Sequence, residues 1–185
     1  MLVGQADCGT APPPPNWTSN NKFHKNFVDK YHVLGDRNSA KTNYLLPVTV
    51  HILGNSNGTG LCYNQYGVMQ TFCKLNRDYD STGIQFYIDT ILYQYNTDGN
   101  AGTNDQDNYF ESIKRPNTIN CFIVGNAAVH GTRVCGYYYG YAVGAGFNGT
   151  PDIVVLDVGC IGPNSGTAAH EMGHYLSLPH TFYGW

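Results

Sequence analysis

The chain carries little charge of either sign. Only 12% of its 185 residues are Asp, Glu, Lys or Arg, and the formal net charge is −3. Since no basic run or stripe occurs, neither nucleic acid nor an anionic membrane is expected as a partner. No apolar stretch approaches the roughly 20 residues that a membrane-spanning helix needs.

Six cysteines accompany this low charge, a combination typical of extracellular proteins, in which disulfides persist. Residues 1–4 are too short to be the apolar core of a signal peptide. We therefore expect a secreted protein whose leader is not part of this chain. Its length fits one domain with a short extra segment, and we expect this domain to act as a monomer.

Apolar periodicity divides the chain into an irregular start and a folded domain. Residues 1–43 are polar and irregular, with a polyproline II spacer predicted at Pro12–Pro15. The pattern then predicts strands at 44–53, 84–92, 118–124, 136–143 and 152–158, helices at 65–79 and 108–114, and a last helix capped by Ser165 or Thr167. Residues 96–107 are predicted to be a turn-rich loop. This order of elements predicts an α/β (α+β) domain with a mixed sheet.

A glycine-rich connection between the strands predicted at 136–143 and 152–158 is typical of a hairpin. Folding this segment about Phe147 and Asn148 places Cys135 opposite Cys160. Because that register brings the two Cα atoms within bridging distance, we predict a disulfide between these cysteines.

The residues that carry chemistry lie near the C-terminal end. His170 and His174 stand four residues apart, so on a helix both imidazoles face one metal ion. His180 follows after the helix should have ended, and a zinc site with these three ligands keeps one tetrahedral position open for water. Glu171 lies beside the first histidine, where its carboxylate can take a proton from that water. An open position is typical of catalytic zinc.

This segment resembles the metzincin signature H-E-x-x-H-x-x-G-x-x-H. Its His-Thr-Phe ending at 180–182 resembles the pappalysin/cytophagalysin family of metzincin peptidases, in particular the secreted bacterial members. The resemblance implies that His170, His174 and His180 bind zinc, and that Glu171 is the general base of peptide-bond hydrolysis by a metal-activated water. It also implies an upper subdomain with a twisted five-stranded sheet, one antiparallel edge strand, a backing helix and an active-site helix.

By the same resemblance, residues 44–185 form the upper subdomain of a metallopeptidase catalytic domain. The edge strand would be 136–143, along which a peptide substrate aligns by main-chain pairing. The substrate-contact candidates on it are Tyr137, Tyr138, Tyr139, Gly140 and Tyr141. A tyrosine-rich strand is equally ordinary in a secreted domain.

Two features depart from the family pattern. Ser177 stands where the family has a glycine, which tolerates the tight turn before the third ligand. No methionine follows Met172, and the chain ends at Trp185. We therefore expect the lower subdomain, with its methionine-containing turn, to be absent, so that the chain is either a fragment or a truncated relative.

The tripeptide that begins at Cys8 resembles the cysteine-containing segment upstream of the family's catalytic domain. This implies that residues 1–43 form a pro-segment, in which a Cys8 thiolate occupies the open zinc position and keeps a zymogen latent. Alternatively, Cys8 is an ordinary disulfide partner or a disordered thiol. The three cysteines left over are an odd number, so one is free or pairs beyond Trp185; they are Cys62, Cys73 and Cys121.

Other candidate ligands fit structural roles better. His51 lies on the alternate face of a predicted strand, and we expect it to be a packed or surface histidine. Asp98, Asp105 and Asp107 offer oxygen atoms for calcium in a Gly/Asn-rich loop, but their spacing lacks the EF-hand pattern.

Three functions follow from these observations. The leading hypothesis is a secreted zinc-dependent endopeptidase that acts on proteins or peptides. The second is a catalytically inactive zinc-containing binding or structural module. The third is a zinc hydrolase of another amide, since the motif defines the metal and the base but not the substrate.

Overall fold

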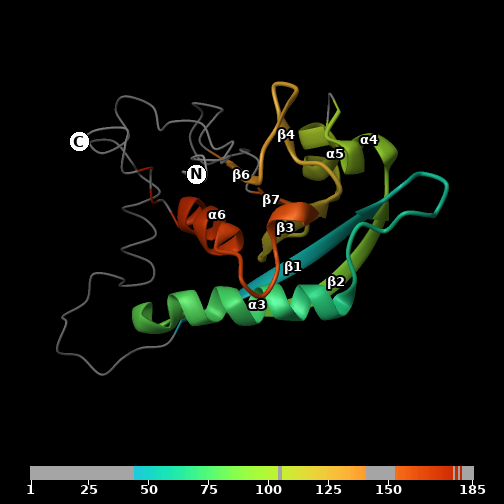
Figure 1. The fold of residues 1–185 in the computed structure, drawn as a ribbon. Coiled ribbons are helices and arrows are strands. Elements are labelled where there is room, and N and C mark those ends of the chain that lie inside the picture. Colours follow the sequence, from blue (N-terminus) through green and yellow to red (C-terminus); the bar gives the residue numbers. More distant parts are fainter. Residues whose placement is uncertain (1–43, 104–105, 141–152, 177, 179, 181–185) are drawn as a thin grey trace.

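A computed structural model of the chain describes residues 44–103, 106–140, 153–176, 178 and 180. Its centre is a five-stranded sheet in the order β2-β1-β3-β7-β6 (Figure 1). The strands are β1 (Tyr44–Gly54), β2 (Ile84–Tyr95), β3 (Ile119–Val124), β6 (Gly136–Tyr139) and β7 (Ile153–Asp157). The first four in this order are parallel, and β6 at the edge is antiparallel to β7. The expected mixed sheet with one antiparallel edge strand is confirmed.

The backing helix α3 (Gln65–Tyr79) connects β1 to β2 and has the predicted bounds. It begins where the Asn64 side chain accepts a hydrogen bond from the Gly67 N–H, 2.8 Å away. Its apolar residues recur at helical spacing and are buried against the sheet: Val68, Phe72, Leu75 and Tyr79.

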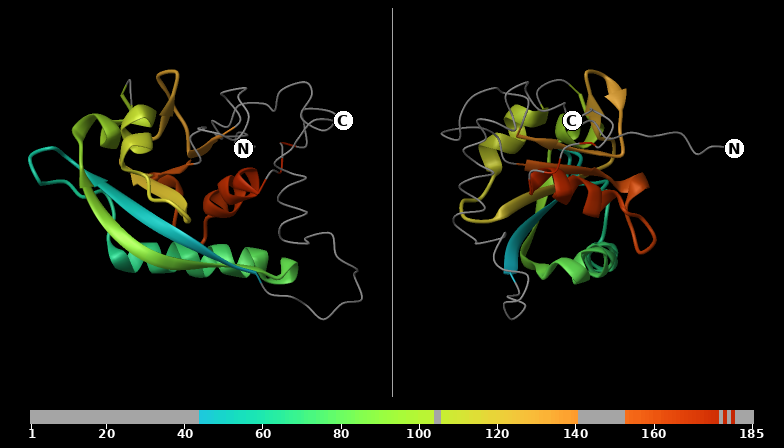
Figure 2. Two further views of the ribbon diagram at one scale, coloured as in Figure 1. Left: turned by 180° about the vertical axis from the view of Figure 1, so that it is seen from behind. Right: turned by 90° about the vertical axis from the view of Figure 1, so that its left-hand side faces the viewer.

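Alternate side chains of the strands build two apolar layers. In β7, Val154 and Leu156 belong to the layer that packs under α3 and α6 (Thr167–Tyr175). Ile153 and Val155 point to the opposite face, where they pack with Phe110 of α5 (Gln106–Ile113). Figure 2 shows α3 on one side of the sheet and α5 on the other. Because these layers cover both faces of the sheet at its centre, every residue of β3 and β7 is buried, the polar Asn120 and Asp157 included.

Two short elements depart from the prediction. The expected loop at 96–107 contains helix α4 (Thr97–Ala101), because the Asn96 side chain accepts from the Gly99 N–H and Gly102 adopts φ 68° after the helix. Strands β4 (Ala128–Val129) and β5 (Thr132–Arg133) form a small hairpin. Its turn residues His130 and Gly131 both have positive φ, as in a type I′ turn.

Other expected features lie outside the described residues. These are the proline spacer, Cys8, Asp105, Ser177, and the end of the predicted edge strand from Tyr141 onward. Within the described part of the chain, none of the helices has both the length and the apolar character needed to cross a membrane.

Candidate metal centre

Helix α6, which carries the H-E-x-x-H residues, is held against the sheet and against α3. Its side chains Ala168, Met172 and Leu176 are buried in the shared apolar layer. The Tyr79 hydroxyl at the end of α3 donates a hydrogen bond to the Ala169 carbonyl oxygen, 3.0 Å away. These contacts fix the rotation of α6 about its axis, and with it the direction of the two histidines.

The start of α6 differs from the prediction. The residue at the N-cap is Gly166, which has no side chain to cap the helix, so neither Ser165 nor Thr167 is the cap. Ser165 still serves the helix, because its Oγ accepts a hydrogen bond from the Thr167 N–H at 3.1 Å. The Thr167 N–H, which has no partner within the helix, is thereby paired by the residue before the N-cap.

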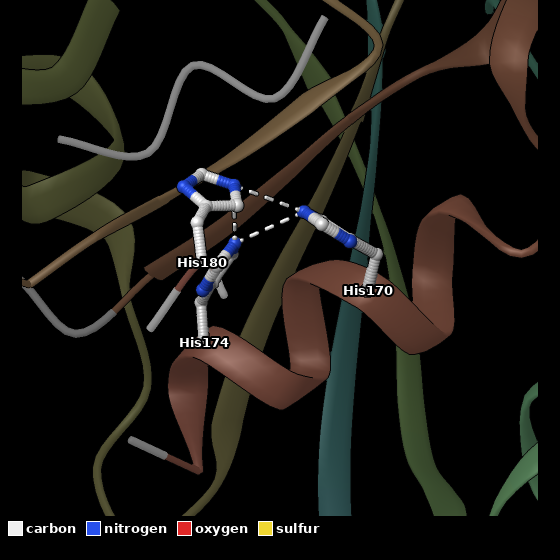
Figure 3. Close-up of side chains that lie close together, drawn as sticks. All are labelled: His170, His174 and His180. Atoms are coloured by element: carbon white, nitrogen blue, oxygen red, sulfur yellow. Dashed lines mark hydrogen bonds between the residues drawn. The ribbon is translucent and has the colours of Figure 1, made fainter. Parts of the chain in front are cut away.

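Three imidazoles, two of them buried, converge beside α6 (Figure 3). Their Nε2 atoms are separated by 3.0 Å (His170 to His174), 3.1 Å (His174 to His180) and 3.2 Å (His170 to His180). The Leu178 N–H donates to the Gly173 carbonyl oxygen at 2.9 Å, a bond that closes the helix and turns the chain back toward its last ligand candidate. Within the described ranges, this is the group of three side chains with metal-binding spacing.

The donor set fits a zinc ion. A carbonyl oxygen accepts hydrogen bonds and cannot donate them, so the 2.6 Å contact from His174 Nδ1 to Leu178 O places the ring hydrogen on Nδ1. In the neutral ring, Nε2 then offers a lone pair to the space between the three imidazoles. In a tetrahedral site with Zn–N distances of about 2.0–2.1 Å, ligand nitrogens stand about 3.3–3.4 Å apart. The Nε2 atoms are 3.0–3.2 Å apart, so the three rings need to move outward only slightly to hold the ion.

Burial keeps these imidazoles neutral. Loss of solvent lowers the pKa of His170, and loss of solvent together with the nearby His170 lowers the pKa of His180. Burial lowers the pKa of His174 to about 4, against the opposing effect of its bond to Leu178. Because metal binding requires unprotonated rings, the site is prepared for a cation at neutral pH.

Glu171 projects from α6 toward the edge strand. Its side chain is only 1% exposed and lies against the backbone of β6 at Gly136. The Glu171 side chain thus lies between α6 and the edge strand, and it follows His170 in the sequence. This is a suitable location for a base that must act on a reactant near the three imidazoles.

The tyrosines of β6 have packing roles in the structure. Tyr137 is 2% exposed and donates its hydroxyl hydrogen to Asp107 Oδ1 at 2.7 Å, while Gln106 Nε2 donates to the Tyr137 oxygen at 2.8 Å. Tyr138 is 7% exposed and packs edge-on against Tyr175 of α6. These two side chains therefore brace the edge strand, and what β6 offers at its outer edge is main chain.

The disulfide expected between Cys135 and Cys160 is present, with the Cα atoms 5.3 Å apart. The predicted register is wrong, however, because the pairing of Gly136 with Leu156 extends to Cys135 beside Asp157. Cys160 reaches its partner from a 3₁₀ turn that follows β7. The bond links the edge strand to the segment that leads into α6. The remaining described cysteines are free thiols: Cys62, Cys73 and Cys121.

Two features near this bond were missed or misjudged from the sequence. Asp157, at the end of β7, is fully buried. It accepts two hydrogen bonds from Arg133 of β5, at 2.8 Å each, and these bonds connect the β4–β5 hairpin to β7. Asp107 bonds Tyr137, so one of the three calcium candidates has a structural role. Sequence reasoning had no local signal for either partner, since both bonds span 24 or more residues.

His51 is a packed histidine, as its strand position predicted. It is fully buried and stacks on Phe122, with ring centroids 4.2 Å apart. Its Nε2 bonds Asn120 Oδ1 at 3.1 Å. It belongs to the layer on the opposite face of the sheet from α6, so it takes no part in the group of three imidazoles.

Comparison with known proteins finds a similarity of fold. No family model and no curated protein matches the sequence. Among solved structures, a mutant of promirolysin from Tannerella forsythia is similar, with a TM-score of 0.62, 17% identity, and coverage of 94% of this chain and 69% of that one. Metalloproteinase-II from Bacteroides fragilis gives a TM-score of 0.44 and 11% identity over 78% of this chain and 48% of that one. The likeness to promirolysin shows that the two chains share a fold.

Proposed function

We propose that this chain belongs to a secreted zinc-dependent endopeptidase. The observation that carries the proposal is the convergence of three imidazole nitrogens within 3.2 Å of one another. Two of them come from helix α6, on which the buried Glu171 follows His170, and the third comes from His180 after the helix has ended. The metzincin-like fold supports it. Residues 44–185 would be the upper subdomain of the catalytic domain, of the pappalysin/cytophagalysin type.

In this function one Zn²⁺ would be held by His170, His174 and His180. Glu171 and the main chain of β6 would have separate tasks. The ion would supply a Lewis acid that polarises the peptide carbonyl and acidifies water. Glu171 would take a proton from the attacking water and then deliver it to the leaving amine. The main chain of β6 would align an extended protein or peptide substrate by adding it to the sheet edge.

Secretion is supported by the Cys135–Cys160 disulfide, which persists in oxidising compartments. The weak net charge of −3 and the absence of a basic stripe agree with a peptide substrate rather than nucleic acid or a membrane surface. We propose that the domain acts as a monomer.

The N-terminal residues 1–43 would form a pro-segment, with Cys8 as a latency ligand. A thiolate at the open zinc position would exclude water and so prevent hydrolysis until the segment is cleaved away. Substituting Cys8→Ala in the unprocessed protein should release activity. Unchanged activity of the unprocessed variant would leave Cys8 as an ordinary thiol.

The experiment that tests the function measures zinc content and cleavage of a mixed peptide library by Cys8→Ala, which lacks the proposed latency ligand, and by Cys8→Ala/Glu171→Ala. We expect one zinc per chain in both proteins and cleavage by Cys8→Ala alone. Zinc without cleavage in either protein would favour the inactive binding module. Equal cleavage by both would remove Glu171 from the mechanism.

A further inference from the structure

The edge strand β6 carries a glycine at the point where it passes Glu171. Gly136 pairs with Leu156 of β7, whose side chain belongs to the layer under α6. Residues that face each other across an antiparallel pair point to the same side of the sheet, so a side chain at position 136 would project toward α6. Tyr138, two residues on, does so and packs against Tyr175.

The backbone at this position does not itself require glycine. Gly136 lies in a regular strand and is not among the residues with positive φ. Glycine within a strand is unfavourable compared with residues that pack, and it is often found where another group approaches closely. The reason for glycine at this position must therefore be the space that it leaves.

That space is taken up by Glu171. A Cβ atom built on Gly136 would lie 2.8 Å from Glu171 Cγ, 3.2 Å from Glu171 Cδ and 2.9 Å from the Val155 carbonyl oxygen. Contacts this short require a neighbour to move. The Val155 oxygen belongs to the central ladder of β7, whereas the glutamate can change rotamer, so the side chain of Glu171 would give way.

We propose that Gly136 is a positioning residue for Glu171: the missing side chain at this point of β6 sets the rotamer in which the carboxylate is held. The inference rests on the proposed function in so far as Glu171 acts as the base. The Cys135–Cys160 disulfide immediately before Gly136 fixes the strand at the same place. Any residue larger than glycine would displace the carboxylate from its working position.

The first test is a double-mutant cycle on stability, which does not depend on activity. Thermal unfolding is compared for wild type, Gly136→Ala, Glu171→Ala and the double variant. We expect Gly136→Ala to lower Tm in the wild-type background by at least twice as much as in the Glu171→Ala background. A Gly136→Ala protein that folds only together with Glu171→Ala would also support the proposal. An equal loss of Tm in both backgrounds would overturn the proposal. So would the failure of both Gly136→Ala and the double variant to fold.

The second test separates positioning from general damage. Gly166→Ala is the control, since nothing lies within 4 Å of a Cβ at that glycine. We expect Gly136→Ala to keep one zinc and its KM while kcat falls about 100-fold, the scale of a 1 Å misplacement of a reacting group. An unchanged kcat in a zinc-loaded Gly136→Ala protein would overturn the proposal. The kinetic comparison uses the Cys8→Ala background, which lacks the proposed latency ligand. If the Cys8→Ala protein binds zinc and cleaves no peptide, the proposed function fails, and the stability cycle still decides the role of Gly136.

Discussion

The imidazole of His174 donates its Nδ1 hydrogen to the carbonyl oxygen of Leu178 across 2.6 Å. The N–H of the same leucine donates to Gly173, in the last turn of α6. A single residue after the helix therefore orients one ring and also directs the chain toward His180. Histidines that bind metals commonly donate their second nitrogen to a carbonyl in this way, which fixes the ring and raises its basicity.

Removing either of the two buried imidazoles should abolish tight zinc binding. For His174→Ala and His180→Ala we expect zinc affinity to fall by more than the roughly 100-fold that loss of a ligand's hydrogen-bond partner can cost. Competition against a chromogenic chelator measures this. His51→Phe is the matched control because His51 lies on the other face of the sheet. The zinc affinity of the His51→Phe protein should equal that of the wild type. Tight binding by His180→Ala would contradict the assignment.

Zinc binding should persist into mild acid. Three imidazoles with the ordinary pKa of about 6.5 would lose roughly eightfold in affinity at pH 6.5 through proton competition. Burial lowers the pKa of all three rings, that of His174 to about 4, so protons compete less with zinc at this pH than they would for solvated rings. We expect the zinc affinity to change by less than about threefold between pH 8 and 6.5 and to decline only at lower pH. A drop of about sevenfold, which three imidazoles of pKa about 6.5 would show over that interval, would indicate ordinary, solvated rings.

His51 should make folding stability depend on pH. Burial lowers the pKa of His51 despite the hydrogen bond that its Nε2 donates to Asn120 Oδ1, so the unfolded chain binds a proton more readily than the folded one. Its contribution is then complete above about pH 6.5 and is lost as the pH falls, by up to about 1.4 kcal/mol per pH unit, until the folded-state pKa is reached. Urea unfolding from pH 8 to 5 should show a steeper loss in the wild type than in His51→Phe.

The aromatic replacement keeps the stack on Phe122, and Asn120 Oδ1 retains its second donor, the Arg115 N–H at 2.8 Å. Both the wild type and His51→Phe should therefore fold, and they should differ in how steeply the free energy of unfolding depends on pH. Parallel stability curves for the two would mean that His51 is not kept neutral by the fold.

The fold could be predicted from the sequence where the determinants are local. Helix α3 was placed residue for residue, because its N-cap and apolar spacing both lie within the segment. Helix α4 was missed because an Asn/Gly-rich segment that indicates a loop also supplies both of its caps. The three ligand candidates were found from their spacing alone. The contacts Gly136–Glu171 and Arg133–Asp157 depend on pairing between distant strands, which no local pattern records.

The Cys135–Cys160 disulfide should contribute substantially to stability. It links residues 25 apart in sequence, for which loop-closure entropy gives about 3.5 kcal/mol. We expect Cys135→Ser/Cys160→Ser to lower the free energy of unfolding by about that amount, whereas the Cys73→Ser control, at an exposed free thiol, should change it little. A loss in the control as large as in the double variant would show that the bridge is not the cause.

The central claim is that three histidines hold one catalytic zinc, and X-ray absorption at the zinc edge tests it most directly. The measurement uses zinc-loaded protein with Cys8→Ala, so that no latency thiolate competes for the ion. We predict three imidazole nitrogens and one oxygen at about 2.0–2.1 Å. A sulfur ligand at about 2.3 Å, or a shell without imidazole scattering, would contradict the account.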